Sequence, residues 1–358
     1  MKMYLSKELV FEATKISTNL KGFNCFLSRY NESIEVIKDF TERGYSDWVI
    51  TFSGGKDSTA TLIIALETAL LIQGAVNRID VFYADTGLEI PLIHNFALEF
   101  LGFIKNFQRV KNLPLEVKIV RPEPEESFWA CLIGKGYPPP HQKFRWCTKR
   151  LKIAPIEKVL KTLKNPSKTL VITGVRFNES KDRNKRLVNS CSRGGECGQG
   201  VWFQHSSRLN LGYLAPIIDW SDCEVWDFLN IYAPCLGYPT EKLEPEVYNG
   251  RGTRFGCWMC TVVRQDKALE KITSLPKWAY LRPLMEFRNR VIEIAYLPSS
   301  RVKRRNGRPG GLKLEVRKRL LSELIKLQDV VGMKLISDEE VKFIKKMWKK
   351  EMGGDKND

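Results

Sequence analysis

The stretch Ser53-Gly54-Gly55-Lys56-Asp57-Ser58 decides the fold because of what lies on either side of it. Before it, residues 47–52 form a β-branched and aromatic run that predicts a buried strand, and after it residues 59–72 are rich in alanine, leucine and isoleucine, which favours a helix. Two adjacent glycines between a strand and a helix let consecutive backbone N–H groups converge on an anion, and the helix N-terminus and Lys56 add positive charge. The stretch therefore predicts a cradle for the pyrophosphate group of a nucleotide. Its spacing is not that of a Walker A loop, so ordinary kinase or GTPase chemistry is not implied.

Length, charge and cysteine content narrow the class of protein. The 358 residues are enough for two domains, and the formal net charge of +17 favours a polyanionic partner, nucleic acid above all, over a merely charged surface. No apolar run approaches the roughly 18 residues that a membrane span needs, so we expect no membrane association. Residues 1–17 lack the hydrophobic core of a signal peptide, and we expect a cytoplasmic protein whose nine cysteines stay reduced.

The order of predicted elements indicates the architecture. A strand over residues 79–84 follows the first helix, which predicts a parallel, right-handed crossover, and residues 115–120 and 169–173 predict further buried strands. We therefore expect an α/β protein with a doubly wound parallel sheet and a mainly helical C-terminal lobe that carries a Cys-x-x-Cys site. The expected parts are an N-terminal helical segment, a nucleotide-binding domain, a cysteine-containing helical lobe and a flexible tail, over residues 1–45, 46–220, 221–350 and 351–358.

Polar residues follow three of the predicted strands. They are the glycine loop, Asp85 and the turn Gly174-Val175-Arg176, and we expect them to line one crevice because the carboxyl ends of parallel strands meet at one edge of a sheet. The candidate phosphate-binding cations are Lys56, Arg145, Arg176 and Arg183. The candidates for acid or base catalysis are Asp57, Asp85 and Glu179.

Five cysteines are candidates for a metal site. Cys257 and Cys260 have the Cys-x-x-Cys spacing with which two thiolates chelate zinc or an iron–sulfur cluster, although two buried thiols or a redox couple also fit an isolated pair. Cys191 and Cys197 form a second pair on a glycine-rich stretch, and Cys147 lies in Arg145-Trp146-Cys147-Thr148. A site with three or four cysteine ligands has to draw on these five.

The C-terminal part contains a basic segment and a helix signal. Residues 301–311 predict a basic, glycine-rich loop that either contacts nucleic acid or is simply solvated. Ser337 followed by Glu340 predicts a capping box at the start of a helix.

These motifs resemble those of a known superfamily. The glycine loop is similar to the PP-loop of the adenine nucleotide alpha-hydrolase-like ATP pyrophosphatases. Asp85-Thr86-Gly87, the stretch 145–148 and the stretch 174–183 resemble the phosphoadenylyl sulfate reductase branch of that superfamily. Within the branch, residues 254–263 look like the DndC-type sulfurtransferases of DNA phosphorothioation.

The resemblance implies an adenine nucleotide alpha-hydrolase-like fold, cleavage of ATP between its α and β phosphates with Mg²⁺, and a [4Fe-4S] cluster, with zinc as the alternative. It implies catalytic roles for Lys56, Asp57, Cys147 and Arg176. The nucleotide-binding residues it implies are Ser53, Gly54, Gly55, Lys56, Asp57, Ser58, Asp85, Arg145, Gly174, Arg176 and Arg183. Two metal sites agree with it: Cys147 with Cys257 and Cys260, or Cys191, Cys197, Cys257 and Cys260 with Cys147 left free for sulfur transfer.

The leading functional hypothesis is an ATP-dependent sulfurtransferase that adenylates a DNA backbone phosphate, releases pyrophosphate and then inserts sulfur. Its expected partners are DNA, a cysteine desulfurase as sulfur donor and other phosphorothioation subunits. The alternatives are an adenylyl sulfate or phosphoadenylyl sulfate reductase, a tRNA thiolation enzyme, and a non-catalytic nucleotide- or DNA-binding subunit. The reductase is disfavoured because the last cysteine is Cys260, so the C-terminal Glu-Cys-Gly motif of such enzymes is absent.

Overall fold

The computed structural model of the chain describes residues 20–177, 196–198, 201–250 and 255–354. The chain divides into two compact units, each assembled from separated segments. Unit 1 comprises residues 1–83, 92–119 and 159–251, and unit 2 comprises residues 84–91, 120–158 and 252–358. The contiguous domain ranges expected from the sequence remain a prediction.

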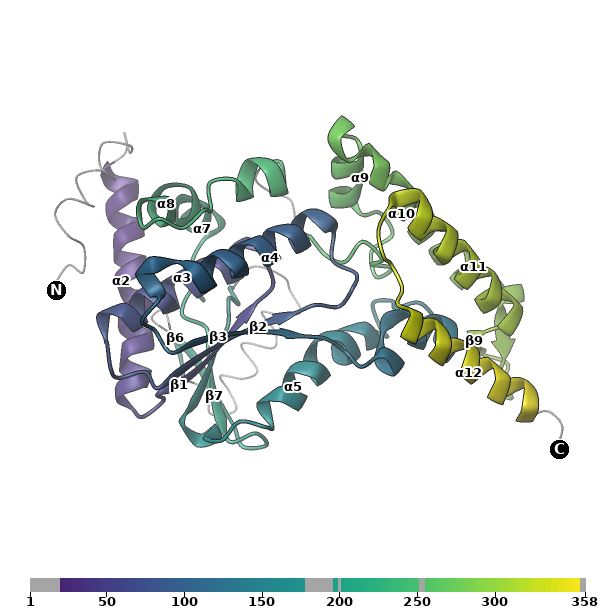
Figure 1. Cartoon of the computed structure of the whole chain (residues 1–358), viewed down its shortest axis with the longest axis horizontal. Helices are drawn as coiled ribbons and strands as arrows, with labels where there is room; N and C mark the ends of the chain where they lie inside the picture. Colours follow the sequence, from purple (N-terminus) through teal and green to yellow (C-terminus); the bar gives the residue numbers. More distant parts are fainter. Residues whose placement is uncertain (1–19, 178–195, 199–200, 251–254, 355–358) are drawn as a thin grey trace. The chain divides into compact units, whose positions relative to one another are not determined.

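Unit 1 is built on a seven-stranded sheet with the order β3-β2-β1-β4-β7-β6-β5 (Figure 1). The strands are β1 (Asp47–Phe52), β2 (Arg78–Ala84), β3 (Leu115–Val120), β4 (Thr169–Ile172), β5 (Glu196–Gly198), β6 (Val201–Ser206) and β7 (Leu211–Leu214). β1 pairs in parallel with β2 and β4, and β4 pairs in parallel with β7, whereas β6 is antiparallel to both β7 and β5. The expected α/β class with a mostly parallel sheet is confirmed.

The strand order shows where the winding of the sheet reverses. From β1 the chain moves outward through β2 to β3, and it then returns to β4 on the other side of β1. The loops after β1 and β4 therefore diverge at the carboxyl edge of the sheet, which is where doubly wound proteins bind ligands. Both strands are buried on their two faces, as their near-continuous apolar sequences require.

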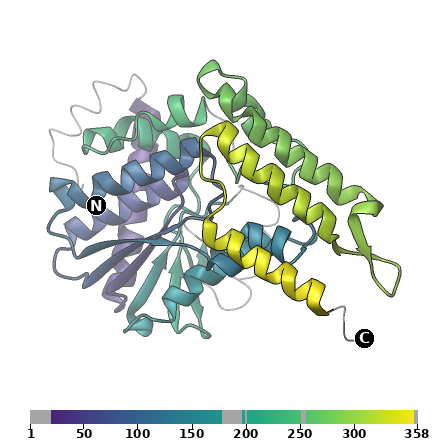
Figure 2. The same cartoon turned by 45° about the vertical axis from the view of Figure 1, so that its right-hand side comes forward.

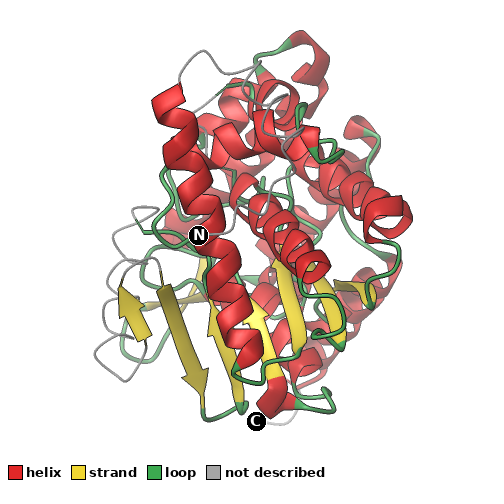
Figure 3. Ribbon diagram, turned by 90° about the vertical axis from the view of Figure 1, so that its left-hand side faces the viewer, coloured by secondary structure: helices red, strands yellow, loops and turns green. Residues whose placement is uncertain are grey.

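Three long helices belong to unit 1: α2 (Leu20–Glu42), α3 (Lys56–Leu71) and α4 (Pro91–Asn106). Figure 3 shows α2 lying across the strands, and the ring of Phe40 on α2 stacks on Phe203 of β6 with 4.3 Å between centroids. α3 is buried along most of its length, because α2 covers the side that the sheet leaves open. The helix that carries the glycine loop is thus held in the core of the unit.

The buried carboxylate of Glu67 ties α3 to two later segments of unit 1. The carboxylate of Glu67 on α3 accepts hydrogen bonds from Arg109 at 2.8 and 2.7 Å and from the hydroxyl of Tyr238 at 2.8 Å. After β7 come the short helical segments α7 (Asp222–Asp227), η6 (Phe228–Tyr232), α8 (Ala233–Cys235) and η7 (Leu243–Tyr248).

Unit 2 is mainly helical, which confirms the helical C-terminal region expected from the sequence (Figure 2). Its main elements are η3 (Ala130–Gly134), η4 (Thr148–Ile153), α9 (Lys267–Thr273), α10 (Arg282–Tyr296), α11 (Leu314–Val331) and α12 (Asp338–Gly354), while α5 (Ala154–Leu160) leads back into unit 1. α10 and α11 run side by side. The predicted capping box begins α12, where the Ser337 hydroxyl accepts from the Glu340 amide at 3.2 Å and the Glu340 carboxylate accepts from the Ser337 amide at 2.7 Å.

The basic segment 301–311 is a β-hairpin and not the loop that we expected. Strands β8 (Arg301–Lys303) and β9 (Pro309–Leu312) pair in antiparallel fashion around a turn in which Gly307 has φ +74°. The guanidinium of Arg301 donates to the Gly310 carbonyl and holds the two strands together. A short paired segment with three glycines carries little β-propensity, so its sequence does not look like a strand pair.

α12 packs onto η3 within unit 2. Its Trp348 indole donates to the Ile133 carbonyl at 3.0 Å, and a Cβ on Gly134 would lie 3.2 Å from Ile344. In the part of the chain that the structure covers, no helix combines the length and the apolar character that crossing a lipid bilayer demands.

Candidate functional site

The glycine loop closes tightly between β1 and α3. Gly54 has φ +74°, and a Cβ there would come within 2.8 Å of the Ala97 Cβ on α4 and 3.1 Å of the Ile93 carbonyl oxygen, so only glycine fits. The hydroxyl of Ser58 lies 3.0 Å from that of Ser53, accepts from the Ser53 amide at 3.1 Å and donates to the Gly55 carbonyl at 2.9 Å. These contacts fix the loop with the N-terminal amides of α3 at its centre.

The turn after β4, the strand next to β1, also reaches the glycine loop. A Cβ on Gly174 would lie 2.8 Å from the backbone carbonyl carbon of Asp57 and 2.9 Å from the amide nitrogen of Ser58. Glycine at this position therefore lets the turn lie directly against the first turn of α3. Two residues further on, Arg176 is 5% exposed and donates to the Trp220 carbonyl at 2.9 Å.

Four charged side chains of unit 1 form one network around the loop. Lys56 Nζ lies 3.2 Å from the Asp57 carboxylate and 3.0 Å from that of Asp222. Arg176 donates through Nε to Asp57 at 2.6 Å and through Nη2 to Asp222 at 3.0 Å. Lys56, Asp57 and Arg176 were predicted from the sequence, and the structure brings these three together with Gly174 and the loop.

Asp222 is a member of this network that the sequence analysis missed. It is the first residue of α7, whose capping box between Ser221 and Glu224 fixes the start of the helix. Partial burial by itself raises the pKa of Asp222, but hydrogen bonds and charge from Lys56 and Arg176 outweigh it and hold the pKa below its ordinary value. The capping pattern was readable in the sequence, but nothing local connects it with a loop more than 160 residues earlier.

Tyr248 is a second missed residue. Its hydroxyl accepts a hydrogen bond from the Lys56 amide at 3.0 Å, and its ring packs edge to face on Trp226, 4.8 Å between centroids. Burial raises the pKa of Tyr248 well above its ordinary value, so the phenol stays protonated. No sequence pattern distinguishes this tyrosine from one in the core.

The chemical capacity of the network follows from these contacts. The helix N-terminus and two buried cations converge on the loop, an arrangement that binds the phosphate oxygens of a nucleotide. Asp57 is held beside both cations and would supply an oxygen ligand to Mg²⁺ bound with a nucleotide, since Mg²⁺ takes oxygen ligands next to phosphates.

The Cys-x-x-Cys turn lies in unit 2. The Cys260 amide donates to the Cys257 carbonyl at 3.0 Å, and the Trp258 amide donates to the Leu88 carbonyl at 2.9 Å, which ties the turn to the segment after β2. A hydrogen bond between the two sulfur atoms raises the pKa of Cys257 and lowers that of Cys260. Cys147 is near enough that the charge of Cys260 adds to the effect of burial in raising the pKa of Cys147.

A set of three thiols fits a thiophilic metal. Sulfur ligands select zinc and iron–sulfur clusters, and Cys147, Cys257 and Cys260 would be the ligands from unit 2. At least one pair of these sulfur atoms is more than 4.8 Å apart, whereas tetrahedral coordination to one zinc ion at about 2.3 Å needs roughly 3.8 Å. These three thiols are therefore not arranged as a closed tetrahedral zinc site.

Arg288 on α10 holds the cysteine turn from behind. It is 1% exposed, and its guanidinium donates to the carbonyls of Cys260 at 2.8 Å, Arg264 at 3.1 Å and Val263. A guanidinium that bonds three backbone carbonyls of one turn fixes the conformation of that turn. No sequence pattern assigned a role to this arginine.

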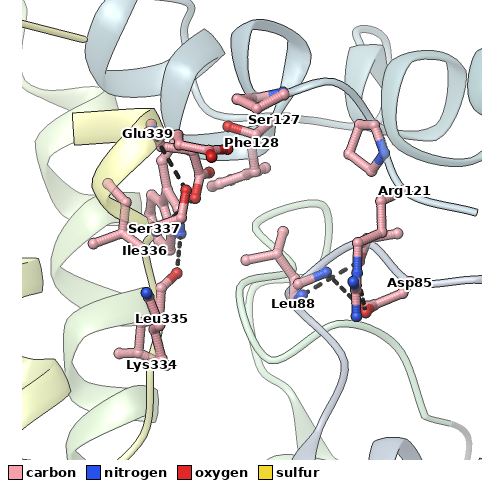
Figure 4. Close-up of a pocket in the computed structure, with 16 residues that line it drawn as sticks. Asp85, Leu88, Arg121, Ser127, Phe128, Lys334, Leu335, Ile336, Ser337 and Glu339 are labelled. Atoms are coloured by element: carbon pink, nitrogen blue, oxygen red, sulfur yellow. Dashed lines mark hydrogen bonds and ion pairs between the residues drawn. The ribbon is translucent and has the colours of Figure 1, made fainter. Parts of the chain in front are cut away.

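A cavity of about 470 Å³ lies in unit 2 beside the same segment (Figure 4). Asp85 and Arg121 form an ion pair of 2.8 Å on one wall, and residues 334–337 before α12 form the opposite wall. Asp85 also accepts from the Gly87 amide at 3.0 Å. Leu88 lines this cavity and bonds Trp258, so the cavity and the cysteine turn share a wall.

The remaining predicted residues lie elsewhere. Arg145 is in unit 2 with an exposed side chain. Cys197 pairs with Trp202 through the backbone of β5 and β6, and only its backbone is described. Glu179, Arg183 and Cys191 fall outside the described residues. The loop, Asp85 and Arg176 were expected to line one crevice. Among the described residues, the loop and Arg176 come together in unit 1, whereas Asp85 belongs to unit 2.

The fold and the site together define an α/β protein with a candidate nucleotide-phosphate site at the reversal point of its sheet. The chain belongs to the phosphoadenosine phosphosulfate reductase domain family, whose model matches residues 47–263, more than half of the chain. The description of the family names a sulfur-carrying nucleotide, in keeping with the candidate phosphate site of unit 1.

Individual known proteins are more distant. The chain is 27% identical over 277 residues to an uncharacterized protein of Methanocaldococcus jannaschii, covering 75% of this chain and 49% of that protein, so it spans about half the length of that relative. Among solved structures, it is similar to the phosphoadenylyl-sulfate reductase of Candida auris, with 13% identity, a TM-score of 0.39, and coverage of 72% of this chain and 98% of that one. It is also similar to the FMN adenylyltransferase of Candida glabrata, with 13% identity, a TM-score of 0.43, and coverage of 90% and 87%.

Proposed function

We propose that the protein is an ATP-dependent sulfurtransferase of the DndC type, which adenylates a DNA backbone phosphate and then inserts sulfur. The observation that carries the proposal is the loop 53–58 at the point where the winding of the sheet reverses. Lys56 and Arg176 both bond the Asp57 carboxylate of this loop. Such a loop grips a pyrophosphate group, which suits cleavage of ATP between its α and β phosphates.

In the first step an oxygen of the DNA phosphate attacks the α-phosphorus of ATP, and the bond from that phosphorus to pyrophosphate breaks. The leaving pyrophosphate keeps the electrons of the broken bond on its oxygen, and the N-terminus of α3, Lys56 and Arg176 stabilise the charge that develops there. Asp57 would hold Mg²⁺ beside the phosphates. The loop therefore acts on the leaving group.

In the second step a persulfide sulfur from a cysteine desulfurase attacks the adenylated phosphorus, and AMP leaves with the electrons of the phosphorus–oxygen bond. A second thiol then reduces the sulfur–sulfur bond, which releases the phosphorothioate and forms a disulfide. Cys147 is the candidate thiol if it is not a metal ligand. An iron–sulfur cluster on the cysteine turn, when bound, would supply electron transfer.

DNA is proposed as the acceptor because the charge excess is concentrated in unit 2. That unit holds 33 lysines and arginines against 19 aspartates and glutamates, whereas unit 1 holds 25 against 22. The β8–β9 hairpin exposes four cations, and none of them pairs with a carboxylate within the described residues: Lys303, Arg304, Arg305 and Arg308. α12 adds five exposed lysines, at positions 342, 345, 346, 349 and 350. Cations of this kind contact a phosphate backbone without reading its sequence.

The products of ATP test the proposal. Purified protein with ATP, Mg²⁺ and duplex DNA should release pyrophosphate and leave AMP attached to the DNA, and Lys56→Ala should lower the rate of pyrophosphate release at least about tenfold, since removing one hydrogen-bond donor from a developing charge costs about 10²–10³ in comparable sites. Lys161→Ala, an exposed lysine of unit 1, is the matched control and should keep the rate. Release of ADP and phosphate alone, with no effect of Lys56→Ala, would contradict the proposal.

The acceptor needs a separate test, because a tRNA thiolation enzyme would use the same adenylation logic. Duplex DNA and tRNA are each incubated with the protein, ATP, cysteine desulfurase, cysteine and a thiol reductant. Electrophoresis in a gel that retards sulfur-containing nucleic acid should show a shift for DNA only. A shift for tRNA only would replace DNA as the acceptor and leave the ATP chemistry intact.

A further inference from the structure

We infer that Asp222 and Tyr248 are residues of the phosphate site, where their oxygen atoms bond the donors that a pyrophosphate group would take. The inference rests on the proposed function, since it requires the loop to bind pyrophosphate. It adds two residues that no motif assigns to the site.

Tyr248 places an oxygen on a backbone donor of the loop. Lys56 is the first residue of α3, so its amide is one of the N–H groups that have no partner inside the helix. The Tyr248 hydroxyl accepts from this amide at 3.0 Å, and it lies 3.4 Å from where a Cβ on Gly55 would be. An oxygen atom thus stands on the anion-binding face of the two glycines.

Asp222 places a negative oxygen between both cations of the site. The same atom, Oδ1, lies 3.0 Å from Lys56 Nζ and 3.0 Å from Arg176 Nη2. One anionic oxygen shared by an ammonium and a guanidinium reproduces what a phosphate oxygen offers to these two groups. Pyrophosphate and Asp222 therefore compete for the same charges.

The two carboxylates of the network differ in how readily they can leave. The Asp222 side chain is 51% exposed, whereas that of Asp57 is 18% exposed and belongs to α3 itself. Moving Asp222 into water costs less than moving Asp57, because Asp222 already keeps about half of its contact with solvent. Asp57 is expected to stay when the phosphates arrive.

Asp222 and Tyr248 come from one segment of unit 1 and are mechanically linked. Trp226, on α7 with Asp222, is fully buried, and its ring meets that of Tyr248 edge to face. A shift of α7 away from the loop therefore also disturbs Tyr248. Return of both residues to the loop after the reaction would help to expel the pyrophosphate product.

Binding of inorganic pyrophosphate in EDTA tests the inference, because chelation removes any contribution of Asp222 as a ligand of Mg²⁺. In isothermal titration calorimetry, Asp222→Asn should lower the Kd about threefold to tenfold, as expected for losing one competing carboxylate. Tyr248→Phe should lower it about twofold to tenfold, as expected for freeing one amide donor. Two controls should leave the Kd as in the wild type: Glu246→Gln on η7, an exposed carboxylate, and Tyr238→Phe, whose hydroxyl bonds Glu67 instead of the loop.

The outcomes separate this inference from the proposed function. Tighter binding in both variants with unchanged controls supports it. Equal or weaker binding in Asp222→Asn and Tyr248→Phe, in a wild type that binds pyrophosphate, overturns the inference and leaves the proposed function standing. If the wild type binds pyrophosphate neither in EDTA nor with Mg²⁺, both are overturned, since there is then no phosphate site for these residues to occupy.

Discussion

Two glycines shape the site because they have no side chain, just as the charged residues shape it through their side chains. Gly54 and Gly174 have no side chain at the two points where the loop meets α4 and where the turn after β4 meets α3. The two constraints differ. Gly54 combines a positive φ with a close approach, whereas at Gly174 the close approach alone excludes a side chain.

Gly54→Ala should destabilise the protein by about 1–3 kcal/mol more than Gly74→Ala does, because overpacking costs about that much in a filled site. Gly74 is the matched control, since it has φ +85° but open space around its Cα, so alanine there adds only the backbone strain. Urea unfolding of both variants measures the difference. Equal losses would show that the contacts with Ala97 and Ile93 carry no penalty.

The cysteines allow a prediction at the same scale. Cys147→Ser, Cys257→Ser and Cys260→Ser should each remove most of the bound iron or zinc, because a serine hydroxyl is a poor ligand for metals that select thiolates. Cys131→Ser is the control, since its buried thiol, with a pKa raised to about 11 by burial, bonds the Glu126 carbonyl and none of these three cysteines. Iron, zinc and sulfide are counted after anaerobic purification.

A full metal content in Cys147→Ser alone would identify Cys147 as a thiol that is free for sulfur transfer. A full content in all three variants would remove the metal site from this turn.

Residue types and spacings in the sequence were sufficient for the part of the site that lies next to strands. Lys56, Asp57 and Arg176 directly follow β1 and β4, so a sheet pattern places them. Asp222 and Tyr248 reach the loop through tertiary packing across α7 and η7, which a local pattern does not encode. Sequence motifs therefore found Lys56, Asp57 and Arg176 and missed Asp222 and Tyr248.

At the scale of elements, helix α10 supports a turn that it does not contain. The guanidinium of Arg288 replaces the partners that the carbonyls of the cysteine turn would have in a regular element. Buried carbonyls without such partners are costly, so the helix and the turn depend on one side chain.

Arg288→Lys should lower stability by about 2 kcal/mol or more and reduce metal content, since an ammonium cannot serve the same carbonyls in a planar fork. Arg290→Lys, two residues along α10, is the matched control: its side chain is 53% exposed and pairs with Glu323 at 3.5 Å, so stability should change by less than about 0.5 kcal/mol. Chemical unfolding and metal analysis are the readouts. Normal metal content in Arg288→Lys would show that the turn holds its shape without the fork.

The strand and helix patterns were informative where burial is regular. The parallel strands are continuous apolar runs and were foreseen, because a strand covered on both faces must be apolar throughout. The β8–β9 hairpin was not foreseen, since its pairing depends on Arg301 bonding Gly310 and on the backbone of Gly307, and not on an apolar pattern.

At the scale of the whole molecule, charge is distributed unevenly between the units. Unit 1, which holds the phosphate loop, is nearly neutral, and unit 2 carries most of the positive excess. Long-range attraction to a polyanion should therefore act mainly through unit 2.

Replacing Lys303, Arg304, Arg305 and Arg308 together by alanine should weaken binding of duplex DNA and flatten its salt dependence. Each lost phosphate contact lowers the slope of log K against log salt by about 0.9. The control replaces Lys161, Lys164 and Lys168, three exposed lysines of unit 1, and should leave the slope nearly unchanged. Fluorescence anisotropy across a salt series provides both values. An unchanged slope in the hairpin variant would show that DNA does not contact the hairpin.

The interleaving of the two units has a consequence for how the protein can be dissected. The chain passes from one unit to the other five times, at residues 83, 91, 119, 158 and 251. A single truncation after residue 251 would remove α10 to α12. Segments 84–91 and 120–158 would remain in the shortened chain without the helices of their unit. Neither unit can be obtained as a separate protein by cutting the chain at one position. ATP chemistry and DNA affinity therefore have to be assigned to residues by point substitution in the intact chain.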